Sequence, residues 1–299
     1  MRHVSPFDLD STQTYLDWRA AKLRDYPANA AGIIVPVADP RQLTPDEHRQ
    51  LTRVCAKTNM AIYTSRQGGE DKEIPRALGA RFGLARLDDN MLADDDALTS
   101  LRHVAEKSGR GYIPYSNKRL LWHTDGYYNP PARRIHAFLL HCVSPAASGG
   151  ENALLDHEIA YIRLRDANPA YVQALMAPDA MTIPPNIEGG EQTRAAETGP
   201  VFSVDPDTGC LHMRYTSRTR SIVWKDDPAT RAAVACIETL LAGDEPFMFR
   251  HRLAANEGIL CNNVLHNRSA FEDNVDDGRT RLLYRARYYD RIAGTECSI

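Results

Sequence analysis

The chain has 299 residues, a formal net charge of -3, 43% apolar residues and 25% charged residues. This composition is typical of a globular protein that buries a sizeable core. It also lacks the basic excess that attracts nucleic acid or an anionic membrane surface, so neither is expected as a partner and a small molecule is favoured.

The sequence carries no signal for export or membrane insertion. Its first residues lack an apolar segment of the signal-peptide type, and no run of about eighteen apolar residues occurs. The six cysteines contain no Cys-x-x-Cys pair, which argues against a zinc knuckle or a redox dithiol. We therefore expect a cytoplasmic protein with reduced thiols, organised as a single domain over residues 1–299.

Helix signals dominate the first 110 residues. Thr44 and Glu47 have the spacing of a capping box, with Pro45 at the first helical position between them. The pattern predicts helices over 11–24, 44–58, 73–82 and 94–107, and a short strand over 60–65.

From Tyr112 onward, β-type patterns become frequent. Strands are expected over 134–145, 210–217, 258–266 and 279–289, and helices over 156–166, from 168 onward, and within 228–242. The stretch 178–200 is rich in Pro, Gly and polar residues, which predicts a long loop that acts as a lid. Helices around late strands favour a mainly β fold with helical insertions, of the α+β class, over a doubly wound sheet.

The stretch LWHTDGYYN contains a candidate metal-binding pair, His123 and Asp125. Roughly one His-x-Asp is expected by chance in a chain of this composition, so the pair needs further support. On a strand, side chains two residues apart face the same way, so both could reach one ion while Thr124 faces away. A third ligand must come from elsewhere, and His266 at the end of a second β run is the natural candidate.

Two histidines and one carboxylate suit iron better than zinc. This set is the facial triad of non-haem Fe(II) oxygenases, which leaves three coordination positions open. Zinc instead prefers a closed or nearly closed tetrahedral shell.

A basic strand follows the third candidate ligand. Four arginines lie at even spacing and so share one face of an extended segment: Arg279, Arg281, Arg285 and Arg287. They are either a solvated edge or a guanidinium fork that binds a dicarboxylate in a pocket. Arg281, fifteen residues after His266, is best placed for the second role, and Arg279 is its rival because a shift in register would exchange them.

Four segments in this order resemble the Fe(II)- and 2-oxoglutarate-dependent dioxygenases of the taurine dioxygenase family. The segments are WHTD, PPARRIHAFLLHCVSPAASGGENALLD, VLHNRSAF and RTRLLYR. The resemblance implies a double-stranded β-helix (jelly-roll) core over 111–299, with 1–110 as an N-terminal elaboration. It also implies Fe(II), 2-oxoglutarate and O2 as cofactors, with release of succinate and CO2.

The resemblance assigns roles to individual residues. It makes His123, Asp125 and His266 the iron ligands, Arg281 and Asn152 the partners of the distal carboxylate of 2-oxoglutarate, and Arg285 a substrate contact. Asn152 stands where the family has a threonine, but its amide can still donate. The chain departs from the family at Leu260-Cys261, where many members have Asp-Asn, which leaves the support of the distal histidine open.

Several alternatives remain open at this stage. Arg285 and Arg287 could form structural ion pairs, and Arg268 could brace either His266 or the cosubstrate. Tyr127 and Tyr128 are candidate substrate contacts, and with Tyr112 and Tyr115 they could form an aromatic cage for a quaternary ammonium group.

The expected function is hydroxylation or oxidative cleavage of a small anionic or amino-acid-like molecule. The alternatives are a betaine-type hydroxylase, a non-catalytic 2-oxoglutarate and metal sensor, and a zinc or manganese enzyme that does not use 2-oxoglutarate. By the habit of the family, a homo-oligomer is expected.

Overall fold

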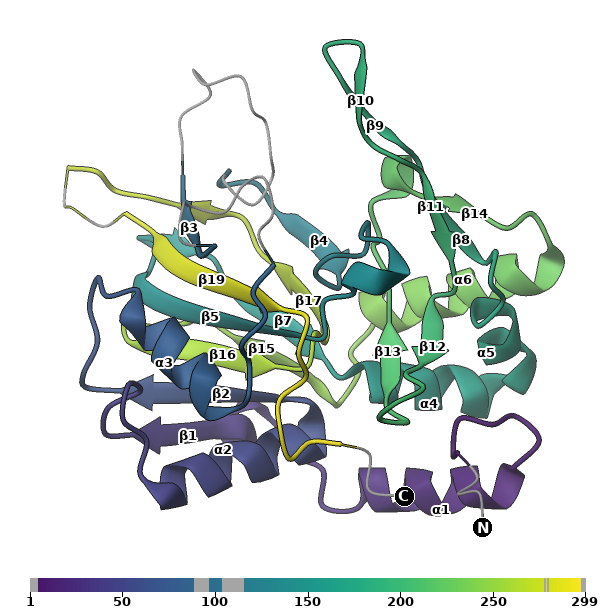
Figure 1. Ribbon diagram of the computed structural model, residues 1–299, viewed down its shortest axis with the longest axis horizontal. Coiled ribbons are helices and arrows are strands. Elements are labelled where there is room, and N and C mark those ends of the chain that lie inside the picture. Colours follow the sequence, from purple (N-terminus) through teal and green to yellow (C-terminus); the bar gives the residue numbers. More distant parts are fainter. Residues whose placement is uncertain (1–4, 89–96, 104–115, 277, 279, 297–299) are drawn as a thin grey trace.

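The structure is a computed structural model that describes residues 5–88, 97–103, 116–276, 278 and 280–296. Its β core consists of a six-stranded and a four-stranded sheet, with helices outside them (Figure 1). The larger sheet runs β1 (Ile34–Val37), β2 (Met60–Ser65), β16 (Glu257–Cys261), β5 (Ala137–Ser144), β19 (Leu282–Tyr288) and β3 (Thr99–Arg102). The smaller sheet runs β15 (Met248–His251), β7 (Asn152–Leu155), β17 (Leu265–Arg268) and β4 (Leu120–His123). Within these two sheets β1 and β2 pair in parallel, and all other described pairs are antiparallel. The predicted mainly β fold with helical insertions is confirmed.

Alternation along β5 divides the larger sheet into two buried faces. Phe138 and Leu140 belong to the hydrophobic cluster that includes Leu154 of the smaller sheet. We call the face on which these two side chains lie the inner face. Ala137 and Leu139 belong to a separate outer cluster. Successive side chains of a strand point to opposite faces, so one continuous apolar run supplies both cores.

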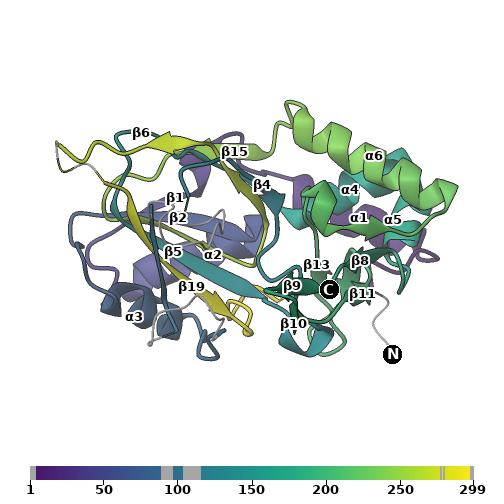
Figure 2. The same ribbon diagram turned by 90° about the horizontal axis from the view of Figure 1, so that it is seen from above.

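The α-helices among the described residues are α1 (Thr12–Leu23), α2 (Pro45–Thr58), α3 (Glu73–Arg81), α4 (His157–Ala167), α5 (Pro169–Leu175) and α6 (Pro228–Ala242). Four of these six, α2, α4, α5 and α6, begin after a residue whose side chain caps them, whereas α1 and α3 do not. In Figures 1 and 2, α2 and α3 cover the outer face of the larger sheet, while α4, α5 and α6 gather at the other end of the molecule. The capping box of Thr44 and Glu47 is formed, which confirms that prediction. Among the described residues, no helix has the length and apolar character needed to cross a membrane.

The predicted helix over 94–107 is wrong in its described central part, where residues 99–102 form β3. This strand pairs antiparallel with β19 at the edge of the larger sheet. Thr99 and Leu101 are buried, whereas Ser100 and Arg102 are more exposed. The burial therefore has a period of two, and pairing with a long neighbouring strand outweighs a local preference for helix.

The predicted loop over 178–200 contains four short strands, so the expectation of a structureless segment is wrong. They are β8 (Met181–Ile183), β9 (Asn186–Glu188), β10 (Glu191–Arg194) and β11 (Glu197–Gly199). The β9–β10 hairpin projects away from the rest of the chain in Figure 1, and a lid role for it stays a prediction. The remaining strands are β6 (Ser148–Gly149), β12 (Phe202–Val204), β13 (Leu211–Met213), β14 (Val223–Trp224) and β18 (Phe271–Glu272).

The expected single β run over 258–266 is divided in two. Its first half is β16 of the larger sheet, and its second half is β17 of the smaller sheet. Between them Asn263 has a φ of 48°, a left-handed conformation that asparagine tolerates better than most residues. This turn carries the chain from one sheet to the other and delivers His266 to the interior.

Candidate metal and cosubstrate site

Two paired strands of the smaller sheet bring the candidate ligands together. In the antiparallel register of β17 and β4, His266 lies directly opposite His123, so both side chains leave the same face. Asp125 follows two residues after the end of β4. The three side chains are buried, and one ligand atom from each lies within 4.8 Å of the other two.

Backbone contacts orient both imidazoles in the same way. Nδ1 of His123 is 2.8 Å from the carbonyl oxygen of Leu121, and Nδ1 of His266 is 2.9 Å from that of Val264. A carbonyl only accepts, so each Nδ1 carries the proton and each Nε2 keeps its lone pair. Burial lowers the pKa of His123 to about 3 and also lowers the pKa of His266, so both rings are neutral near pH 7. Neutral imidazoles with free Nε2 atoms are metal ligands.

The carboxylate of Asp125 completes a site that fits a divalent cation. Its Oδ1 lies 3.8 Å from Nε2 of His123, and its Oδ2 is buried without a hydrogen-bond partner. Burial raises the pKa of this carboxyl, but the nearby guanidinium groups of Arg285 and Arg287 outweigh burial and hold the pKa below its usual range. An ionised oxygen left unpaired beside two neutral imidazoles suits Fe(II) with this ligand set.

Asn263 clamps the backbone of Asp125, a role that sequence reasoning missed. Its Oδ1 accepts from the Asp125 amide at 2.7 Å, and its Nδ2 donates to the carbonyls of Asp125 at 2.9 Å and Ile135 at 2.7 Å. Asn263 thus lies in the turn that precedes His266, and its side chain also holds the backbone of Asp125, another candidate ligand. An asparagine between two β segments is the only signal that the sequence offers for this role.

Replacing Asn263 with alanine should therefore loosen the metal site. The Asn263→Ala variant removes the clamp on Asp125, and supporting contacts of this kind are typically worth about 10- to 100-fold in metal affinity. Fe(II) titration under anaerobic conditions, with circular dichroism as a check on folding, measures the effect. Asn274→Ala offers a control away from the clamp. Unchanged iron affinity in a folded Asn263→Ala protein would contradict the positioning role.

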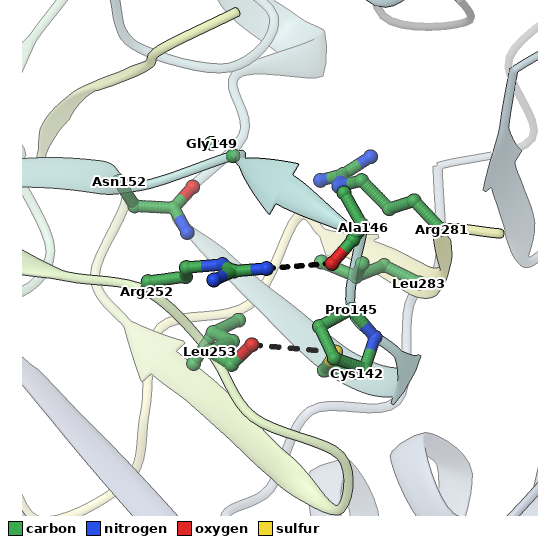
Figure 3. Close-up of a pocket in the computed structure, with 10 residues that line it drawn as sticks. Cys142, Pro145, Ala146, Gly149, Asn152, Arg252, Leu253, Arg281 and Leu283 are labelled. Atoms are coloured by element: carbon green, nitrogen blue, oxygen red, sulfur yellow. Dashed lines mark hydrogen bonds between the residues drawn. The ribbon is translucent and has the colours of Figure 1, made fainter. Parts of the chain in front are cut away.

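Arg281 lies in a pocket formed between the two sheets (Figure 3). Asn152 and Arg252 line the same pocket, together with Cys142 and Leu283. The guanidinium of Arg281 is buried and stacks over the ring of Phe271 at 5.0 Å. Among the described residues no acceptor pairs with this guanidinium, and burial lowers the pKa of Arg281 to about 10. The Nδ2 of Asn152 is likewise buried without a partner.

The backbone beside this pocket requires glycine. Gly149 has a φ of +68°, and a Cβ there would lie 2.2 Å from the carbonyl oxygen of Ala270. At Gly150, with a φ of +74°, a Cβ would lie 3.9 Å from Nε of Arg281. The two glycines thus let the chain turn tightly against Arg281 before it enters β7 at Asn152.

Arg268 places a second buried cation close to Arg281. It stacks on Phe271 at 4.7 Å and donates to the backbone carbonyls of Ser116, Lys118 and Ser269. Burial and the charge of Arg281 lower the pKa of Arg268 to about 9. Two buried guanidinium groups without a carboxylate partner in the described chain make this end of the site ready for an anion.

Arg285 and Arg287 make buried ion pairs on the inner face. Arg285 Nη1 lies 3.4 Å from Oδ1 of Asp125, and Arg287 is paired with Asp88. Arg287 Nη1 also donates to the hydroxyl of Tyr128 at 3.0 Å. Arg285 therefore contacts a candidate metal ligand directly, and its role as a substrate contact stays a prediction.

The other candidates lie partly outside the described residues. Tyr127 and Tyr128 meet edge to face at 5.2 Å just after Asp125. Arg279, the rival of Arg281, and Tyr112 and Tyr115, the other members of the predicted aromatic cage, lie outside the residues that the structure describes. Leu260 and Cys261, which replace the usual Asp-Asn of the family, are buried parts of β16.

The sequence profile of the family described as "Taurine catabolism dioxygenase TauD, TfdA family" matches residues 19–287. The chain belongs to this family. The resemblance drawn from the sequence motifs is thereby confirmed, and the requirement for Fe(II), 2-oxoglutarate and O2 is the one expected for it. No curated protein sequence matches the chain.

Solved structures share the fold at low sequence identity, which confirms the expected jelly-roll core. An asparagine oxygenase in complex with Fe(II), 2S,3S-3-hydroxyasparagine and succinate has a TM-score of 0.57 at 15% identity, over 96% of this chain and 86% of its own. The non-heme iron oxygenase OrfP with Fe, succinate and (3S)-hydroxy-L-Arg gives 0.58 at 16%, over 95% and 90%. A taurine dioxygenase from Burkholderia xenovorans gives 0.57 at 21%, over 88% and 87%.

Proposed function

We propose that this chain is a 2-oxoglutarate-dependent dioxygenase that hydroxylates or oxidatively cleaves a small anionic or amino-acid-like molecule. The observation that carries the proposal is that two groups of buried polar atoms on the inner faces lack partners among the described residues. Two neutral imidazoles and an unpaired carboxylate oxygen suit Fe(II), and an unpaired buried guanidinium suits a carboxylate. A cosubstrate that is both a metal chelator and a carboxylate satisfies both requirements.

In this proposal His123, Asp125 and His266 hold the iron. When bound, the iron and 2-oxoglutarate supply the oxidising chemistry, in which 2-oxoglutarate and O2 yield succinate and CO2 while a substrate C–H bond is oxidised. Arg281 binds the distal carboxylate, and the unpaired amide of Asn152 donates to the same group. Because these side chains are buried, the site excludes water and keeps the bound carboxylate in one orientation.

The other residues orient the ligands and line the substrate side. Asn263 fixes the backbone of Asp125, and Arg285 keeps its carboxylate ionised and in place. Arg285, Tyr127 and Tyr128 are the proposed substrate contacts. The amino acid derivatives in the asparagine oxygenase and OrfP structures support an amino-acid-like substrate here.

A quaternary ammonium substrate is less compatible with the described residues. The ring of Tyr128 already has Arg194 over it at 5.7 Å, and its hydroxyl accepts from Arg287. A further cation would meet like charge at this position, whereas an aromatic cage needs a free ring face. An anionic group is favoured at this position for the same reason.

Two measurements on the wild-type protein test the proposal. Adding 2-oxoglutarate to the anaerobic Fe(II) protein should produce a visible charge-transfer band, which a zinc or manganese enzyme that does not use 2-oxoglutarate would not give. Succinate formation should then require both iron and O2, and amino acids and organic acids should stimulate it. A band without any succinate formation across such a panel would identify a sensor, and no band at all would contradict the proposal.

A further inference from the structure

The segment 215–218 runs directly beside β4, which carries His123, and beside Thr124, which follows it. The Thr124 amide donates to the carbonyl of Tyr215 at 3.0 Å, and the Ser217 amide donates to the carbonyl of Trp122 at 2.8 Å. Between these bonds Thr216 pairs with His123 as an antiparallel bridge. Arg218 therefore follows two residues after Thr216, the backbone partner of the proposed iron ligand His123.

The guanidinium of Arg218 has no acceptor among the described residues. Its Nε is buried without a hydrogen-bond partner, and it is the backbone amide of Arg218, not its guanidinium, that donates to Oγ1 of Thr216. The nearby Arg285 and Arg287 also have an unpaired Nε, but each has a carboxylate on its other nitrogens. Arg218 thus differs from them in having a partly buried charge that the described protein leaves unsatisfied.

Thr216 links Arg218 to the strand of the first candidate ligand, because it pairs with His123 and its Oγ1 accepts from the Arg218 amide. Tyr127 follows two residues after Asp125 on the adjoining segment, and its ring contacts that of Tyr128. Arg218 and Thr216 therefore lie beside the segment that carries His123, Asp125 and Tyr127.

Leaving a guanidinium partly buried and unpaired is unfavourable for folding. Such a group is explained when a ligand supplies the missing acceptor, because binding sites commonly keep strained or unsatisfied groups at some expense of stability. The unsatisfied charge is positive, and its flat donor array matches the two oxygens of a carboxylate or sulfonate.

We propose that Arg218, together with Tyr127 and Thr216, binds an anionic group of the primary substrate, of the carboxylate or sulfonate class. This inference rests on the proposed function and deepens it, since it names the residue that selects the substrate. It also separates two anion sites, one at Arg281 for the cosubstrate and one at Arg218 for the substrate.

The test uses the full chain loaded with Fe(II) and 2-oxoglutarate without O2. The probes are small carboxylic and sulfonic acids, including amino acids and taurine, each paired with its neutral amide. Binding is followed by the change in the charge-transfer band. At least one acid should bind the wild type more tightly than its amide does. Arg218→Met should lower the affinity for that acid on the order of 10- to 100-fold and leave the affinity for its amide unchanged.

Two further variants make the comparison specific. Arg218→Lys should keep part of the preference for the acid, because it retains the charge but loses the planar donor array. Arg220→Met removes an exposed arginine two residues away and should behave as the wild type. Arg218→Met should also melt no lower than the wild type, since it removes an unsatisfied buried nitrogen.

The outcomes separate this inference from the proposed function. Absence of the band in the wild type would overturn the proposed function, and this inference with it. A normal band would overturn this inference alone if no acid binds, if acids and amides bind equally, or if Arg218→Met keeps the preference for the acid. Loss of the preference for the acid in Arg218→Met, with the preference kept in Arg220→Met, would support this inference.

Discussion

Replacing Asp125 with alanine should abolish iron- and O2-dependent succinate formation. The change removes one of the three proposed ligands, so the loss of Fe(II) affinity should exceed the roughly 100-fold effect of losing a supporting contact. It also leaves Arg285 buried beside no carboxylate, and breaking a buried pair in this way destabilises a protein by about 3–5 kcal/mol. Iron titration, succinate release and thermal unfolding measure the three effects.

A second variant separates the ligand from the ion pair. In Asp125→Ala with Arg285→Met, the buried charge is gone as well, so most of the lost stability should return while iron binding stays lost. An Asp125→Ala protein that binds iron and forms succinate like the wild type would contradict the ligand assignment. If the double variant melts no higher than the single one, the pair with Arg285 has no role in stability.

Replacing Arg281 with methionine should raise the KM for 2-oxoglutarate strongly and leave iron affinity unchanged. Losing one partner of a buried, hydrogen-bonded charge pair costs about 2–5 kcal/mol, which corresponds to a factor of about 30 to several thousand. The KM of Arg281→Lys should lie between those of the wild type and Arg281→Met, because an ammonium group keeps the charge but not the planar pair of donors. Succinate formation as a function of 2-oxoglutarate concentration gives the KM.

The control for this prediction is Arg250→Met on strand β15 of the smaller sheet. Arg250 is exposed, and its guanidinium donates to the sulfur of Met248, so the KM should not change. A wild-type KM in Arg281→Met would refute the assignment. If Arg279→Met then raised the KM instead, the two arginines would have exchanged the roles that the sequence predicted.

Local signals in the sequence predicted the helices well. The capping box at Thr44 forms as expected, and Asp156, Asn168 and Asp227 cap α4, α5 and α6. These interactions join residues within about one turn, so the order of residues in the chain is enough to reveal them. The short strand over 60–65 was also predicted correctly, whereas the strand at residues 99–102 was missed for the opposite reason. Residues 99–102 become a strand only because β19 lies beside them.

The candidate site shows the same division. His123 and Asp125 could be paired from sequence because a strand puts alternate side chains on one face. Their meeting with His266 depends on the register of β17 against β4, which the sequence could only suggest through a resemblance. Asn263 and Arg218 were missed entirely, since nothing in their own neighbourhood shows that they lie against the segment of His123 and Asp125.

The amino-acid sequence by itself determined which chemistry the protein can hold: two imidazoles, a carboxylate and a row of arginines at the spacing of a strand. Only the tertiary structure decided which of these groups stay unsatisfied. Arg285 pairs with Asp125 and Arg287 with Asp88. Among the described residues, the guanidinium groups of Arg281 and Arg218 have no carboxylate partner, and Oδ2 of Asp125 has no hydrogen-bond donor. The physical reason is that pairing between charges depends on distance in space, and contacts between remote segments are set by strand register and by the turn at Asn263.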